Sequence, residues 1–120
     1  GIIAAQGNNS LGGVGVAYNC QIMAIKAAQY SGVLSASDIA RAINYAVAQG
    51  ADVINMSFGG YNRSQIEEDA LAVAFGQAVL VAAAGNDGLT NERVCDFRAK
   101  AFYPAAYNWS SESWLRPAAG

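Results

Sequence analysis

The amide side chain of Asn86 is the group in this sequence best placed to bind a ligand. It directly follows the apolar run 79–84 and Gly85. A strand would hold such a residue rigidly, and a glycine lets the backbone turn and approach a ligand closely. The amide can both donate and accept hydrogen bonds. The chain contains no histidine, so residues 1–120 cannot supply an imidazole as a general base.

The elements that must hold Asn86 follow from the spacing of apolar residues. Short apolar runs bounded by polar residues or glycine predict strands at residues 20–27, within 51–60, and from residue 79. A helix is predicted in residues 35–50, where apolar residues recur at i, i+3, i+4, i+7 and i+8. That stripe consists of Ile39, Ala42, Ile43, Ala46 and Val47. Ser35 and Asp38 form its predicted capping pair, and Gly50 its left-handed cap.

A second helix is predicted in residues 64–76. Ser64 and Glu67 have capping-box spacing, and Gly76 is a stop signal. We expect the acidic run 67–69 to be a solvated helix start, favoured by the helix dipole.

The order strand, helix, strand, helix, strand predicts the fold class. Nearly continuous apolar strands that alternate with helices indicate an α/β protein, a parallel β-sheet with helices on its faces. In such a sheet ligands bind beyond the carboxyl ends of the strands. Those ends carry the polar, glycine-rich segments QYSGVLS, SFGG and GNDG.

Composition excludes several classes of protein. A length of 120 residues fits at most one small domain, and 53% hydrophobic residues with only 13% charged residues argue against disorder. A net charge of −2 without a basic cluster argues against a nucleic-acid partner. The apolar runs are too short to span a membrane, and the opening GIIAAQGNNS has neither an initiator Met nor a basic region, so no signal peptide is predicted in it.

Two covalent features stay open at this stage. Cys20 and Cys95 could form one disulfide or remain two free thiols. Asn-x-Ser sequons begin at Asn8, Asn62 and Asn108. These counts do not settle the compartment.

Four segments together resemble a known family. GIIAAQGNNSLGGVGVA, DVINMSFGG, VAAAGNDG and YPAAY, in this order and spacing, are similar to the central part of a subtilisin-like serine protease (subtilase). The resemblance covers residues 1–107 as the central part of a peptidase domain and leaves residues 108–120 as a divergent tail. It implies a serine-type endopeptidase, a hydrolase that acts by acyl transfer on an extended peptide or protein substrate.

The resemblance also implies roles for individual residues. Asn86 matches the asparagine of the oxyanion hole. One wall of the primary specificity pocket, which also pairs with substrate backbone, corresponds to Ser57, Phe58, Gly59 and Gly60. The opposite wall corresponds to Ala83, Ala84 and Gly85. Ser31 and Gly32 match the edge segment to which an extended substrate adds as a strand.

The family's calcium loop corresponds to residues 7–13. It implies Asn9 as a side-chain ligand and carbonyl ligands from Gly7, Leu11 and Gly13, an incomplete set because the family's other ligands come from elsewhere in the chain. Calcium is therefore expected only in a full-length parent, and the chemistry requires no cofactor. Tyr103-Pro104 matches a step that is cis in the family.

Departures from the family pattern qualify what this chain does alone. The catalytic Asp, His and Ser of the family have no counterpart in it, so we expect residues 1–120 by themselves to be inactive. Phe102 stands at the base of the pocket where many members have a small residue, which predicts exclusion of large side chains. Secretion is favoured by the resemblance alone.

Two alternatives from other classes remain. A non-catalytic homologue would serve as a peptide-binding or structural module, and a small-molecule-binding α/β domain would hold its ligand at the strand ends. A physical objection stands against both: a parallel sheet needs cover on each face, and a fragment with only two whole helices is expected to leave apolar area exposed. That exposed area predicts self-association of residues 1–120.

Overall fold

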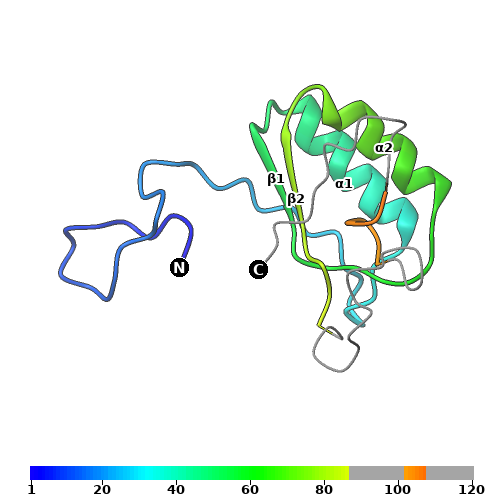
Figure 1. Ribbon diagram of the computed structural model, residues 1–120. Helices are drawn as coiled ribbons and strands as arrows, with labels where there is room; N and C mark the ends of the chain where they lie inside the picture. The colour runs from blue at the N-terminus through cyan, green and yellow to red at the C-terminus, as the bar shows by residue number, and fades with distance from the viewer. Residues whose placement is uncertain (87–101, 108–120) are drawn as a thin grey trace.

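The computed structural model describes residues 1–86 and 102–107. Along the chain it contains α1 (Ala36–Ala48), β1 (Val53–Met56), α2 (Gln65–Phe75) and β2 (Val79–Ala82), as Figure 1 shows. The predicted α/β class is confirmed, because β1 and β2 pair in parallel and α2 connects them.

The register of the sheet aligns the two strands residue by residue. Val53 pairs with Val79 and Met56 with Ala82. The pairing continues past both ends, since the Val79 N–H donates to the Asp52 carbonyl at 2.9 Å and the Ala83 N–H to the Met56 carbonyl at 3.2 Å. The carboxyl ends of both strands therefore lie at one edge of the sheet, as parallel pairing requires.

Helix α1 begins and ends where its capping residues predict. The Ser35 hydroxyl accepts a hydrogen bond from the Asp38 N–H at 3.1 Å and lies 2.7 Å from Asp38 Oδ2, to which it donates. Gly50 follows the C-cap Gln49 with φ +74°, the left-handed conformation that favours glycine.

Helix α2 begins differently from the predicted capping box. Ser64 is the N-cap, but its side chain makes no capping hydrogen bond. The prediction of a solvated acidic start is wrong for Glu67 and Glu68, which are both buried. Arg63 binds Glu68 at 2.6 Å, and the Tyr107 hydroxyl lies 3.4 Å from Glu67 Oε2, so contacts outside the helix replace the local box.

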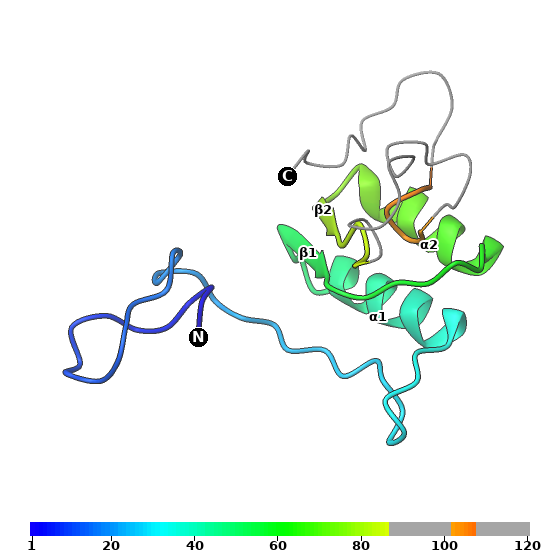
Figure 2. The ribbon, with the colours of Figure 1, turned by 60° about the horizontal axis from the view of Figure 1, so that its bottom comes forward.

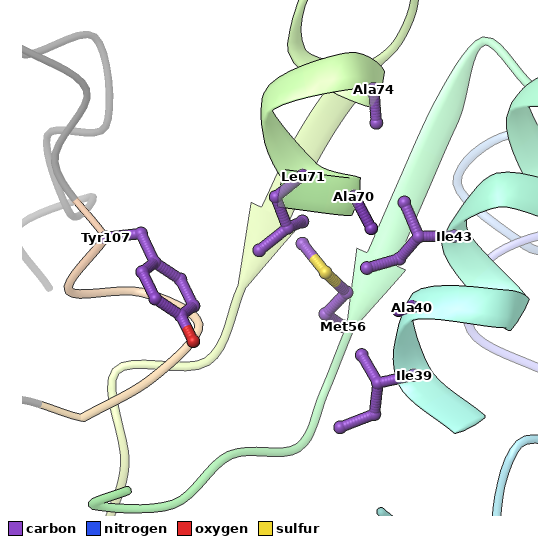
Figure 3. Packing of buried hydrophobic residues seen from close by; sticks show 8 residues of the cluster. All are labelled: Ile39, Ala40, Ile43, Met56, Ala70, Leu71, Ala74 and Tyr107. Atoms are coloured by element: carbon purple, nitrogen blue, oxygen red, sulfur yellow. The ribbon is translucent and has the colours of Figure 1, made fainter. Parts of the chain in front are cut away.

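The core lies between the two helices and one face of the sheet. Figure 3 shows Met56 of β1 between Leu71 of α2 and Ile43 of α1. Leu71 is 1% exposed and Ala74 fully buried. Complete burial of a leucine contributes about 1.5–3 kcal/mol, so these contacts hold α1 and α2 on the sheet.

Both helices of the described chain cover the same face of the sheet. Figure 2 shows β1 and β2 on one side of the helix pair. Ile54, Met56, Leu80 and Ala82 pack toward the core. The intervening valines of the strands, Val53, Val79 and Val81, are 58%, 61% and 46% exposed. Within the described residues the second face is uncovered.

The residues before Gln29 form an arm that runs away from the α/β unit (Figures 1 and 2), whereas the Gln29 amide donates to Asp38 Oδ2 at 3.5 Å and Leu34 packs against the core. The predicted strand at residues 20–27 is wrong: this segment pairs with no other part of the described chain, and Ile22 and Met23 are exposed. A strand forms only with a hydrogen-bonded neighbour, which local apolarity cannot supply.

The helices are also short. At 13 and 11 residues, neither helix in the described part of the chain has the length and apolar character to cross a membrane.

Candidate active site

Asn86 lies just past the carboxyl end of β2 and is exposed. The preceding Gly85 has φ +95°, so the chain turns sharply between the last sheet contact, at Ala83, and Asn86. A side chain other than hydrogen would be strained at that φ. The structure thus places Asn86 at the rim of the sheet, and its role as a hydrogen-bond donor to a ligand stays a prediction.

The segment 57–60 leaves the carboxyl end of β1. The Phe58 side chain packs against the core, and the Ser57 hydroxyl accepts a hydrogen bond from the Asn55 amide at 2.9 Å. That amide is a donor and cannot deprotonate a serine. This geometry suits a Ser57 that shapes the wall rather than attacks a substrate.

Gly60 is already paired within the chain. Its N–H donates to the Tyr103 carbonyl at 2.9 Å, and its carbonyl accepts from the Tyr103 N–H at 2.7 Å. This antiparallel bridge joins the end of β1 to the segment 102–107. Any backbone pairing with a substrate would therefore fall on residues before Gly60.

The Phe102 ring contacts both predicted pocket walls. A Cβ atom added to Gly59 would collide with this ring, lying 2.7 Å from Phe102 Cζ, and would be 2.5 Å from the Tyr103 carbonyl oxygen. A Cβ on Gly85 would lie 3.3 Å from Phe102 Cγ. Phe102 is half-buried, and only glycine at position 59 permits this approach.

The turn that carries Phe102 is anchored at its far end on α2. Tyr103-Pro104 is a cis peptide, and the Tyr107 hydroxyl donates to the Ser64 carbonyl and accepts from the Ser64 N–H, each at 2.9 Å. Both figures of the whole chain show this segment, in orange, beside α2. Burial raises the pKa of Tyr107, with a smaller opposing effect from the Ser64 backbone hydrogen bond.

The predicted substrate-edge residues lie in a turn. Gly32 has φ +81° and its N–H donates to the Gln29 carbonyl, while the Gln29 N–H donates to the Val33 carbonyl, each at 2.9 Å. Ser31 and Gly32 are exposed, but this is not the extended conformation of an edge strand. Their substrate role stays a prediction.

The loop 7–13 lies far from the other predicted site residues, at the outer end of the arm (Figure 1). The Leu11 N–H donates to Asn9 Oδ1 at 3.1 Å, and Asn8, Ser10 and Gly12 all have φ near +60°. Its base is closed by hydrogen bonds from residues 15–17 to residues 2–5. Among the residues described, no three His, Cys, Asp or Glu side chains gather as a metal site. Asn9 Oδ1 and backbone carbonyls are nevertheless the hard oxygen donors that calcium accepts.

Tyr61 and Tyr107 belong to this region, and the sequence did not single them out. The Tyr61 and Phe102 rings meet edge to face with centroids 5.5 Å apart, and those of Tyr103 and Tyr107 lie 4.6 Å apart. The sequence signals were the position of Tyr61 directly after Gly59-Gly60 and that of Tyr107 at the end of the YPAAY segment. Of the cysteines, Cys20 is an exposed free thiol, and Cys95 lies outside the described residues.

Comparison with known proteins assigns the family. The model of the subtilase family matches residues 1–115. Over 108 residues the chain is 41% identical to the thermophilic serine proteinase of Bacillus sp. (strain AK1), covering 89% of this chain and 25% of that protein. It is 38% identical to the minor extracellular protease Epr of Bacillus subtilis (strain 168) and to thermitase of Thermoactinomyces vulgaris, in each case over 90% of this chain. These alignments span 16% and 36% of the two relatives, so the chain covers about a third of their length or less. The chain belongs to the subtilase family.

Proposed function

We propose that this chain is part of a serine endopeptidase that hydrolyses peptide bonds by acyl transfer, with Asn86 as an oxyanion-hole donor. The observation that carries the proposal is the exposed amide of Asn86 at the carboxyl end of β2, directly after the left-handed Gly85, in a chain matched to the subtilase family. Residues 57–60 and 83–85 would form the walls of the pocket beside it.

In this proposal the chain supplies electrostatic stabilisation and shape. A serine attacks the scissile carbonyl and a histidine accepts the proton of the serine. The side-chain amide of Asn86 donates a hydrogen bond to the carbonyl oxygen and stabilises the negative charge that develops on it. Since the chain has no histidine, the histidine must come from another part of a longer polypeptide, and the resemblance to the family implies the same for the catalytic aspartate and serine. Residues 1–120 alone should therefore show no proteolysis.

The same proposal covers cofactor, substrate and location. The substrate is an extended peptide or protein. Loop 7–13 would provide Asn9 Oδ1 and carbonyls of Gly7, Leu11 and Gly13 to a structural calcium ion whose remaining ligands lie elsewhere. Secretion is proposed from relatives such as the extracellular protease Epr.

The first test is the coding DNA on both sides of this segment. The family's histidine stands in an HGTH segment and its nucleophilic serine in a GTS segment. An aspartate-bearing strand and HGTH upstream in frame, with GTS downstream, would support the protease. A frame without them would favour a non-catalytic, peptide-binding relative.

The functional test replaces Asn86 by Ala in the complete protease. We expect turnover to fall by about 10²–10³ with little change in KM, which is the scale known for loss of such a donor in a subtilisin, itself a member of this family. Asn44→Ala, an exposed asparagine on α1, is the matched control. Equal turnover of the Asn86 and Asn44 variants on a chromogenic peptide would contradict the role of Asn86.

A further inference from the structure

The Phe102 ring is placed where a substrate side chain would enter between the two proposed pocket walls. It contacts Gly59 on one wall and Gly85 on the other, and the approach at Gly59 is so close that no side chain could be added there. Because the phenyl ring contacts both walls, little space remains between them for a large substrate side chain.

The backbone at Phe102 is held in place, so it cannot easily move away from Gly59 and Gly85. Immediately after Phe102, Tyr103 is joined to Gly60 by two hydrogen bonds of 2.7 and 2.9 Å. The Ala106 N–H donates to the Phe102 carbonyl at 2.9 Å, and Pro104 is fully buried. Tyr107 then ties the turn to Ser64. Opening the pocket would therefore require the Phe102 side chain to rotate.

Tyr61 restricts that rotation. Its ring meets Phe102 edge to face, at 75° between the planes and 5.5 Å between centroids, an arrangement favoured for aromatic pairs. Tyr61 is 46% exposed, so one part of it faces solvent while another contacts Phe102. It also follows Gly60 directly, and thus shares the backbone anchored to Tyr103.

We propose that Phe102 and Tyr61 form an aromatic plug that limits the primary pocket to small side chains. The preferred substrates then carry a residue of about the size of alanine, glycine or serine immediately before the scissile bond. Phe102 determines the depth of the pocket, and Tyr61 is a positioning residue that acts through Phe102. This inference rests on the proposed endopeptidase function.

The test uses the complete protease and tetrapeptide p-nitroanilides that differ only in the last residue, Ala or Phe. Active enzyme is counted by titration with a serine-reactive phosphonate, so that poorly folded variants do not distort kcat/KM. Wild type should prefer Ala over Phe by at least about 10-fold. Phe102→Gly should raise the ratio of kcat/KM for the Phe substrate to kcat/KM for the Ala substrate on the order of 10- to 200-fold.

The Tyr61 variants test positioning. Tyr61→Ala should raise relative kcat/KM for the Phe substrate about 2- to 10-fold, the fold-change equivalent of one aromatic pair, and should do so through KM. Tyr61→Phe keeps the ring and should keep wild-type selectivity. Tyr45→Ala, an exposed tyrosine on α1, is the control and should leave both substrates unchanged.

The outcomes separate the two proposals. Suppose that the wild-type enzyme reacts with the phosphonate but prefers the Phe substrate, or that Phe102→Gly and the milder Phe102→Leu keep the wild-type selectivity. Either result contradicts the aromatic plug but not the proposed protease function. A loss of activity shared equally by both substrates in Tyr61→Ala overturns its positioning role. A complete protein that neither cleaves peptides nor reacts with the phosphonate overturns the proposed function, and the plug with it.

Discussion

Glu67 is a carboxylic acid in the first turn of α2 with only 5% of its surface exposed. Burial raises its pKa above the ordinary value, and the hydrogen bond from the Tyr107 hydroxyl opposes this only in part. The Tyr107 proton is shared with the Ser64 carbonyl, 2.9 Å away against 3.4 Å for Glu67 Oε2. The carboxylate is therefore only weakly compensated for its lost hydration.

Glu67→Gln should stabilise the protein at neutral pH. A carboxyl group with a raised folded-state pKa contributes stability fully below its unfolded pKa, near 4.5, and loses that contribution as pH rises through the folded value. The glutamine cannot ionise, so its advantage in urea midpoint should be present at pH 7 and vanish below about pH 4. Asp69→Asn, at an exposed neighbour, is the control. If the difference in urea midpoint between Glu67→Gln and wild type were constant from pH 4 to 7, this role of burial would be refuted.

At the scale of single elements, the two helices start in contrasting ways. Ser35 caps α1 through its hydroxyl, whereas the Ser64 side chain makes no capping bond on α2. The Ser35 hydrogen bond is the main cause of the lowered pKa of Asp38, followed by that from Gln29. The start of α1 is thus fixed by its own sequence, and that of α2 by Arg63 and Tyr107.

Ser35→Ala should destabilise the protein by about 1 kcal/mol, the usual effect of losing a serine N-cap. Ser64→Ala should destabilise the protein clearly less, because the Ser64 side chain makes no capping hydrogen bond. The lowered pKa of Asp38 contributes stability above its unfolded value of 3.8 that is lost as pH falls through the folded pKa. Ser35→Ala should therefore also flatten the acid side of the stability profile, measured by urea unfolding at pH 7 and pH 3. Equal losses for the two serine variants would contradict the difference in capping.

At the scale of the whole molecule, the dominant physical feature is the face of the sheet that the described residues leave uncovered. Val53, Val79 and Val81 stand on it, and the arm adds exposed apolar side chains such as Ile2 and Val16. Parallel strands are normally covered on both faces. An apolar surface of this kind favours association of the isolated chain.

Val79→Lys should reduce that association. The isolated 120-residue chain is expected to self-associate, and a charge on the sheet face should shift it toward monomer in sedimentation equilibrium. Val73→Lys makes the same change at a similarly exposed valine of α2, since Val73 is 57% exposed and Val79 61%. This control should shift the chain less toward monomer. A monomeric wild type with a sharp two-state melt would contradict the prediction.

Several local features of this protein were determined by its sequence. The stripe from Ile39 to Val47, the cap at Ser35 and Gly50, and the apolar runs of β1 and β2 predicted their elements correctly, because helix periodicity and capping depend on residues a few positions apart. The placement of Asn86 after β2 followed from the same local pattern.

Tertiary structure alone decided the rest. Residues 20–27 have strand composition but no backbone partner among the described residues, so no strand forms. Glu67 is buried by Tyr107, which lies 40 residues away in the chain, and Phe102 reaches Gly59 and Gly85 only because the turn 102–107 returns to α2 and to the end of β1. A local pattern carries no information about which distant segment will fold against it, and in this protein that return determines both the burial of the acid and the proposed depth of the pocket.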